Sequence, residues 1–308
     1  YRQAALNLLG KSDDPMVLSG EAYDEQEMDT NNEERKDRAG TFLIHQNNMM
    51  LKYLFHQYDE ALEHAVLTRP LLDAVLAKYD VAIFWFYEGL VNMAAARVKS
   101  GRESDSMLRR AKKNISQFKK WAKYCPVNHQ HKLDLLMAEM AWCKGNEEKA
   151  RKHFDLAIKG AEKGEFLNEE ALSLERAGLY YLVTGQEFIA ENYLRKAYQI
   201  YKEWGAAAKM KDLKNRFPKF LIGLDKAAQD DSSTPSEGSG TTGESSTLDL
   251  ETLMKSAQAL SGEVVLDQLL KTLLNISIEN AGAESGCIIM KQGEDWHIKS
   301  AHFVNQKD

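Results

Sequence analysis

Residues 41–217 contain almost no proline and consist of long stretches in which apolar side chains recur every three to four residues. Short turns with Gly or Asn separate these stretches. A period near 3.6 is that of a helix with one buried face, and an internal proline would break its hydrogen-bond ladder. The sequence therefore predicts a run of consecutive helices in a mostly α chain.

Two of the expected helix pairs share a pattern anchored on a glycine. From Gly145 and from Gly185, small or apolar residues follow at offsets +5, +9 and +12, namely Ala150, Phe154 and Ala157 in one copy and Ala190, Leu194 and Ala197 in the other. Offsets −11, −7 and −4 hold Asp134, Ala138 and Ala141 in the first copy and Leu174, Gly178 and Tyr181 in the second. The pattern resembles the tetratricopeptide repeat, in which small residues let antiparallel helices approach closely. The anchors lie 40 residues apart, so we expect helices longer than those of the usual period of about 34.

Weaker copies precede these two. Ala61 and Ala65 stand at +5 and +9 from His56, and Gly101 opens a further copy that has lost the alanines at those offsets. We therefore expect four helix pairs, forming a tetratricopeptide-like helical-repeat solenoid over residues 41–224. Pro218 should end the last long helix, because its ring disfavours a helical residue before it.

Residues 225–247 are rich in Ser, Thr, Gly and Asp and are expected to form a flexible linker. Their stretch GSGTTGES, residues 238–245, has the glycine spacing of nucleotide-binding loops. A phosphate loop needs a lysine before its final hydroxyl residue, but Glu244 stands there and would repel a phosphate. We predict a linker at this position in preference to a nucleotide site.

Two features follow the linker. Ser246 and Asp249 form a capping box, and a heptad-like apolar stripe then runs through Leu250, Leu253, Ala257, Leu260 and Val264. This predicts a helix within 248–279 that packs on a partner, with a second copy of the chain as a candidate. The final stretch GCIIMKQGEDWHIKSAHF predicts a β-hairpin with its turn at Gly293.

Composition disfavours several classes of function. The formal net charge of −6 is spread over both signs, which gives no basic field for nucleic acid and no polybasic stretch for an anionic membrane. The most apolar segment, 81–96, is too short for a membrane span and carries Glu88 and Asn92. Cys125, Cys143 and Cys287 are odd in number and widely spaced, which favours free thiols in a cytoplasmic setting.

The Cys and His residues are candidate metal ligands or phosphoacceptors. Cys125, His129 and His131 could bind zinc if a fourth ligand existed, but no second Cys or His pair has finger spacing. We expect PVNHQH to join two helices, with its imidazoles at helix ends or in water. The histidines His45, His56 and His64 share no single helical face, and none of His129, His131 and His153 has the acidic and proline-containing flank of a phosphoacceptor.

The aromatic run from Phe84 to Tyr87 could line a cofactor, but it also suits the core around an inner helix, and we predict core. The acidic run between Glu21 and Arg38 has no apolar period and is expected to be a solvated loop. No catalytic, cofactor-binding or metal-binding residue is assigned.

Several phrases together resemble one family, the very large hybrid signalling kinases. They are NLLGKSDDPMVLSGEAYDE, YCPVNHQHKLDLLMAEMAWCKGN, FLNEEALSLERAGLYYLVTGQ, YKEWGAAAKMKDLKNRFP and LDLETLMKSAQALSGEVVLDQLLKTLLNISIENAGAESGCIIM. That family joins a Ser/Thr kinase-like domain, a predicted ATPase, helical repeats, a GAF sensor and a histidine kinase. The resemblance implies a lead-in from a preceding module at 1–40, repeats at 41–224, the linker at 225–247, and a connecting helix with the truncated start of an α/β GAF domain at 248–308.

The same resemblance implies a function without catalysis in this segment. The family's phosphate loop, kinase catalytic loop and histidine box would lie outside these residues, so ATP would belong to the parent kinase. We expect an interaction and signal-relay segment whose partners are proteins or neighbouring domains, including a homodimer through 248–279. The alternative is a free-standing tetratricopeptide adaptor that binds peptides in its concave face.

Overall fold

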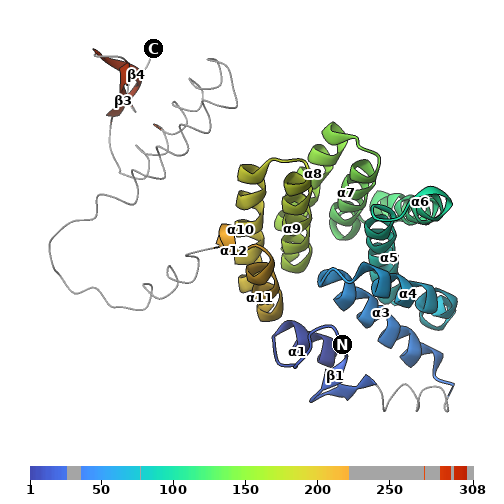
Figure 1. Cartoon of the computed structure of the whole chain (residues 1–308). Coiled ribbons are helices and arrows are strands. Elements are labelled where there is room, and N and C mark those ends of the chain that lie inside the picture. Colours follow the sequence, from blue (N-terminus) through green and yellow to red (C-terminus); the bar gives the residue numbers. More distant parts are fainter. Residues whose placement is uncertain (26–35, 77, 222–273, 275–284, 293–294, 304–308) are drawn as a thin grey trace. The chain divides into compact units, whose positions relative to one another are not determined.

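The computed structural model describes residues 1–25, 36–76, 78–221, 274, 285–292 and 295–303 (Figure 1). The chain divides into two compact units, Tyr1–Asp231 and Ser232–Asp308. We call the described part of the first the helical unit. The predicted linker, including 238–245, and the predicted helix at 248–279 lie outside the described residues apart from Leu274.

The helical unit confirms that the chain is mostly α. It begins with α1 (Arg2–Leu8) and a two-stranded antiparallel ribbon, β1 (Ser19–Gly20) and β2 (Tyr23–Asp24). The long helices follow: α3 (Arg38–Leu54), α4 (Tyr58–Thr68), α5 (Asp80–Ala96), α6 (Gly101–Tyr124), α7 (Pro126–Cys143), α8 (Glu147–Lys163), α9 (Leu167–Val183) and α10 (Glu187–Trp204). A 3₁₀ segment η1 (Arg69–Val75) separates α4 from α5, and α11 (Ala207–Arg216) and α12 (Pro218–Leu221) end the unit.

Consecutive long helices pack against each other, α3 on α4, α5 on α6, α7 on α8 and α9 on α10, with further contacts from each pair to the next. Helix α5 is buried at nearly every position from Phe84 to Ala96, whereas α6 buries one stripe that includes Ala111 and Phe118. The same contrast separates α7 and α9 from α8 and α10. The first helices of these pairs are therefore inner and the second helices outer.

The repeated sequence positions have the same structural role in both copies. Gly145 and Gly185 follow α7 and α9 with left-handed φ angles of 66° and 77°, a conformation that glycine adopts without steric cost. The side chains at +5, +9 and +12 from both glycines are fully buried. His56 takes the glycine position in the first pair with a φ of 68°. The residues at these repeated offsets are therefore the ones that pack between neighbouring helices.

The copy that begins at Gly101 corrects one expectation. No alanine or glycine stands at its expected offsets, but the buried positions of α6 are displaced by one residue, so that Met107, Ala111 and Asn114 face the interior. Ala111 is fully buried. The small residue needed for close packing is present one position later.

Replacing Gly178 with alanine is expected to destabilise the helical unit by about 1–3 kcal/mol through overpacking. A Cβ atom at this position of α9 would lie 2.8 Å from Cγ of Leu194 in α10. Urea unfolding followed by circular dichroism measures the loss. Combining the change with Leu194→Ala, which makes room for the methyl group, should cost less than the sum of the two single changes. A Gly178→Ala variant as stable as the original would contradict this packing.

The junction between α6 and α7 corrects a second expectation. PVNHQH does not join two helices, because α7 begins at Pro126 and includes the whole stretch. Proline is favoured at the first position of a helix, where its missing N–H has no partner to lose. At the other proline junction the prediction is confirmed, since α11 ends at Arg216 and α12 begins at Pro218.

The second unit contains β3 (Ser285–Gln292) and β4 (Asp295–Phe303), which pair antiparallel from Ser285 opposite Phe303 to Gln292 opposite Asp295. The predicted hairpin is therefore confirmed. Its turn residues 293–294 lie outside the described residues.

Candidate functional site

The interior of the helical unit contains an unusual group of charged side chains. Glu139, Glu175, Arg176 and Lys209 are each no more than 2% exposed. Buried charges are costly unless they are paired and hydrogen-bonded. They belong to a set that we call the central polar network: His56, Tyr58, Arg97, Glu139, Glu175, Arg176, Tyr201, Lys209, Asp212 and Arg216.

Glu139 of α7 is the centre of the first half of this network. Its carboxylate accepts hydrogen bonds from Arg176 Nε at 2.7 Å and from Arg97 Nη1 at 2.6 Å. The Arg97 guanidinium lies 4.0 Å from the centroid of the Trp142 ring. Burial alone would raise the pKa of Glu139, but the charges of Arg176 and Arg97 outweigh it and hold that pKa below its usual value. Glu139 is therefore ionised between two cations.

Glu175 of α9 is the centre of the second half. It accepts hydrogen bonds from Lys209 Nζ at 3.1 Å and from the Tyr201 hydroxyl at 2.7 Å. Lys209 also donates to the backbone oxygen of Leu54 at 2.6 Å and to Asp212 at 2.9 Å. Burial opposes ionisation of Glu175, yet Lys209 and the hydrogen bond from His56 hold its pKa well below the usual value.

A chain of hydrogen bonds joins the two halves. Arg176 Nη1 donates to the Tyr58 hydroxyl at 2.7 Å, and that hydroxyl lies 2.6 Å from His56 Nδ1. His56 Nε2 lies 2.7 Å from Glu175 Oε1. Burial lowers the pKa of His56 to about 4, so the ring is neutral at pH 7. One tautomer satisfies all contacts: Nδ1 accepts from Tyr58 while Nε2–H donates to Glu175.

The network connects segments that are far apart in the sequence. His56 and Leu54 lie at the turn between α3 and α4, while Glu175 and Lys209 lie on α9 and α11. Within the helical unit the helices follow an arc that brings α11 towards the N-terminal helices (Figure 1), and α1 contacts α11. The network therefore fastens the first helix pair to the last helices of the unit.

One part of the network has the residue types of a metal site. Ligand atoms of His56, Glu175 and Asp212 all lie within 4.8 Å of one another. However, the Lys209 ammonium group contacts both carboxylates, at 3.1 and 2.9 Å. It already supplies the positive charge that a metal ion would bring, and we therefore interpret the cluster as an ion pair network.

The structure separates the Cys–His set considered as zinc ligands. Cys125, His129 and His131 do not form a ligand cluster within the described part of the chain. His131 is buried and stacks on Phe166 with ring centroids 4.6 Å apart, and His129 packs on Trp121 at 5.6 Å. The expectation that these imidazoles cap helix ends or face water is thus corrected for His131, whose buried ring Phe166 covers, whereas His129 stays partly exposed.

Two further histidines are closer than the sequence suggested. His45 of α3 and His64 of α4 share no face of one helix, but their Nδ1 atoms lie 3.2 Å apart across the helix pair. Burial, with smaller contributions from His45 and Lys52, lowers the pKa of His64 to about 4. His153 contacts Asp134 at 2.9 Å. These rings are held by neighbouring side chains of the fold.

Lowering the pH from 7 to 5 is expected to reduce the free energy of unfolding by about 1–2 kcal/mol for each of His56 and His64. Both have folded-state pKa values of about 4, whereas an unfolded histidine titrates near 6.5. The unfolded chain therefore takes up protons first, and stability falls as the pH drops through this window. Urea titrations at pH 7, 6 and 5 measure the effect, and His64→Gln should flatten the slope. Equal stability at pH 7 and 5 would contradict the neutral, buried assignment.

The remaining candidate side chains lie in the hydrophobic core or pack against it. Burial raises the pKa of the Cys143 thiol, whose Sγ lies 3.3 Å from the Met93 carbonyl oxygen. In the aromatic run, Phe84 and Phe86 are almost fully buried, and Trp85 packs against Trp121. The prediction of core at this run is confirmed.

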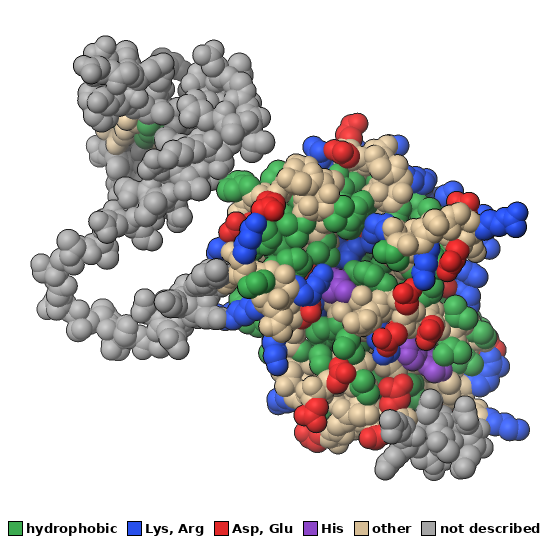
Figure 2. All heavy atoms as spheres, in the orientation of Figure 1, with side chains coloured by type: hydrophobic (Ala, Val, Ile, Leu, Met, Phe, Trp, Pro, Cys, Tyr) green, Lys and Arg blue, Asp and Glu red, His purple; other side chains and the backbone are tan. Residues whose placement is uncertain are grey.

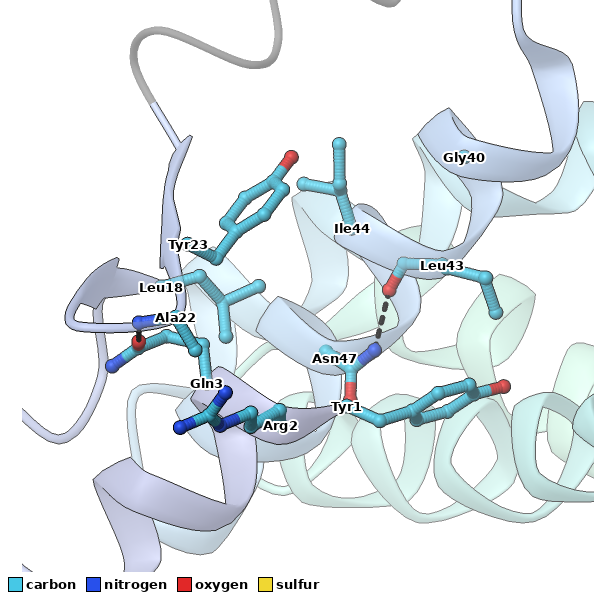
Figure 3. Close-up of a pocket in the computed structure, with 10 residues that line it drawn as sticks. All are labelled: Tyr1, Arg2, Gln3, Leu18, Ala22, Tyr23, Gly40, Leu43, Ile44 and Asn47. Atoms are coloured by element: carbon cyan, nitrogen blue, oxygen red, sulfur yellow. Dashed lines mark hydrogen bonds between the residues drawn. The ribbon is translucent and has the colours of Figure 1, made fainter.

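A surface pocket of about 350 Å³ lies between α1, the β1–β2 ribbon and α3 (Figure 3). Its polar groups bind one another: Gln3 Oε1 accepts from the Ala22 amide at 2.9 Å, and Asn47 Nδ2 donates to the Leu43 oxygen at 2.7 Å. Among the described residues, the side chains that line this pocket include no Asp, Glu, His or Cys.

No helix in the described ranges combines the length and the hydropathy that crossing a bilayer requires. Glu88, in the most apolar helix, is buried and accepts hydrogen bonds from Arg69 and Asn114.

In comparisons with known proteins, no family model matches the sequence and no curated protein is significantly similar to it.

Proposed function

We propose that this chain is a non-catalytic interaction and relay segment of a multidomain signalling kinase. In this proposal, helices α3–α10 form a tetratricopeptide-like scaffold that is coupled through the 248–279 helix to a GAF sensory domain beginning near β3. The central polar network carries the non-catalytic part of the proposal. The four charged groups at its centre, Glu139, Arg176, Glu175 and Lys209, are buried and paired with one another, which suits a structural interior better than a site open to substrate. The resemblance to hybrid kinases supports the signalling context.

The network also suggests how a signal could pass through the unit. The chain leaves the unit through α11 and α12 towards residues 222–273. Lys209 of α11 is bound to Leu54 and to Glu175. A displacement of α11 therefore cannot occur without changing contacts of the α3–α4 turn and of α9. In this mechanism, packing changes at the sensory end reach the N-terminal helix pair through buried ion pairs.

The dimer part of the proposal is tested by disulfide crosslinking. In a background with the three native cysteines changed to serine, single cysteines at Leu253 and at Leu260 should crosslink between two chains on mild oxidation. Lys255 lies between these positions and off the apolar stripe, so Lys255→Cys is the matched control and should not crosslink. Absence of crosslinks at the stripe, or equal crosslinking at all three positions, would contradict a helix dimer.

A titration with Mg-ATP tests the absence of catalysis in this segment. We expect no saturable binding to the chain. Saturable binding that Glu244→Ala alters would instead assign a nucleotide site to the stretch at 238–245.

The alternative is an adaptor that binds a peptide in its concave face. The inner side chains of α7 and α9 described above are occupied by contacts within the unit, which disfavours that face as the binding surface. A partner peptide would need another surface, and the outer helices provide one.

A further inference from the structure

A second surface pocket, of about 510 Å³, lies where α6, α7 and α8 meet. Four exposed lysines surround it: Lys112 and Lys119 on α6, Lys144 after the end of α7, and Lys149 on α8. We call it the basic pocket. Lys and Arg side chains are also visible on the edge of the helical unit where Figure 1 places α6 (Figure 2).

The charge of the basic pocket is not neutralised by the protein. Within the part of the chain that the structure describes, no Asp or Glu lines it. Among the described residues, none of the four lysines has a carboxylate oxygen within 4.0 Å, whereas Lys132 and Lys209 elsewhere in the unit are both paired. Four like charges around one hollow repel each other and attract an anion. The local field is thus opposite in sign to the net charge of the chain.

The floor of the pocket is apolar. Ile115 of α6 and Met137, Met140 and Ala141 of α7 form it. Unbranched methionine side chains adapt to different apolar partners. A ligand that fills this pocket therefore needs both negative charges for the rim and apolar groups for the floor.

Two features favour a peptide over a phosphate or nucleotide. The backbone amide of Lys149, which a phosphate at the start of α8 would use, already donates to Asn146 Oδ1 at 3.1 Å. The described residues that line the pocket also include no Phe, Tyr or Trp that could stack on a base. Asp and Glu carboxylates flanking Leu or Ile side chains meet both requirements.

We propose that the basic pocket binds an acidic peptide segment of a partner protein, with apolar side chains on the Met137–Met140 floor and carboxylates against the four lysines. This inference rests on the proposed scaffold function and deepens it by naming the partner's chemistry. Its test measures the pocket alone, so a failure there would leave the crosslinking result at 253 and 260 unaffected, and the reverse also holds.

The test measures fluorescence anisotropy of a fluorescein-labelled peptide, EELDELLEELDE, titrated with the full chain at about 150 mM salt, where long-range surface charge effects are screened. We expect saturable binding that Lys112→Glu combined with Lys119→Glu weakens by about tenfold or more. The matched control combines Lys113→Glu with Lys120→Glu. It makes the same charge change at exposed positions of the same helix that do not line the pocket, and it should alter affinity by less than about threefold.

Two further probes identify what the pocket recognises. A peptide with serine in place of every leucine should bind more weakly, because the floor would lose its apolar partner. Inorganic phosphate at millimolar concentration should not displace the acidic peptide. No saturable binding, equal loss in both lysine double variants, unchanged affinity of the serine peptide, or full displacement by phosphate would each overturn the proposal. Circular dichroism and melting temperature verify that the variants fold.

Discussion

Replacing Glu139 with leucine is expected to lower the free energy of unfolding of the helical unit by about 3–5 kcal/mol. The change removes the carboxylate that accepts from both Arg176 and Arg97. Arg176 is only 2% exposed and would remain as an uncompensated buried cation. Arg97 is closer to solvent and can turn towards water. Urea unfolding at pH 7, followed by circular dichroism, measures the loss.

Two comparisons make this prediction specific. Glu147→Gln breaks an exposed ion pair with Arg151 on α8 and should change stability by no more than about 0.5 kcal/mol. Combining Glu139→Leu with Arg176→Met replaces both buried charges by apolar groups and should recover at least about 2 kcal/mol relative to the sum of the single changes. Additive single changes would contradict a direct, buried ion pair.

Replacing Glu175 with glutamine is expected to cost about 3 kcal/mol or more, because it removes the negative charge between His56 and Lys209. Lys209 is fully buried and, among the described residues, would keep only Asp212 as a charged partner. The stabilisation by Glu175 should also depend on pH. The pKa of Glu175 is depressed in the folded state. Its contribution to the free energy of unfolding is therefore present at neutral pH, and it is lost as the pH falls below about 4.3, the pKa of glutamate in an unfolded chain.

The matched control for this change is Glu187→Gln, which breaks the exposed pair between Glu187 and Lys219 and should have little effect. Urea titrations of both variants at pH 7 provide the comparison. If Glu175→Gln were as mild as Glu187→Gln, the buried carboxylate would not be the junction between the two ends of the unit.

The features that sequence predicts best are those with a strict spacing. Gly145 and Gly185 mark turns with left-handed backbone, and the buried positions of α8 and α10 follow them at equal distances. This works because helix periodicity and glycine's conformational freedom are local properties. The hairpin of β3 and β4 was predictable for the same reason, since short-range alternation and a glycine turn define it.

The central polar network could not be predicted in this way. Glu175 and Lys209 meet only because the arc of helices brings α9, α11 and the α3–α4 turn together, and the spacing within any one helix does not contain that information. One signal was present: the inner helix sequence LSLERAGLYY places adjacent charges, Glu175 and Arg176, inside an otherwise apolar stretch. Charged residues inside an apolar stretch are expected to be buried and paired with opposite charges. The sequence does not identify the partner.

The His45–His64 contact was missed for a related reason. Testing whether histidines share one helical face cannot detect rings that meet from two packed helices. The spacing from Gly101 does not predict the buried stripe of α6, because Gly101 is itself the first residue of that helix and the buried positions are displaced by one residue. In the other two copies the anchor glycine lies before the helix.

In our interpretation, buried ion pairs fasten the first and last helices of the unit into one body. Hydrogen exchange measured by mass spectrometry on the original chain and on Glu175→Gln can show whether the two ends of the unit are joined in this way. We predict that the variant loses protection simultaneously in peptides covering the end of α3 and in those covering α11, while α6 and α8 keep theirs. Loss confined to α9, with the α3 and α11 peptides unchanged, would contradict the claim.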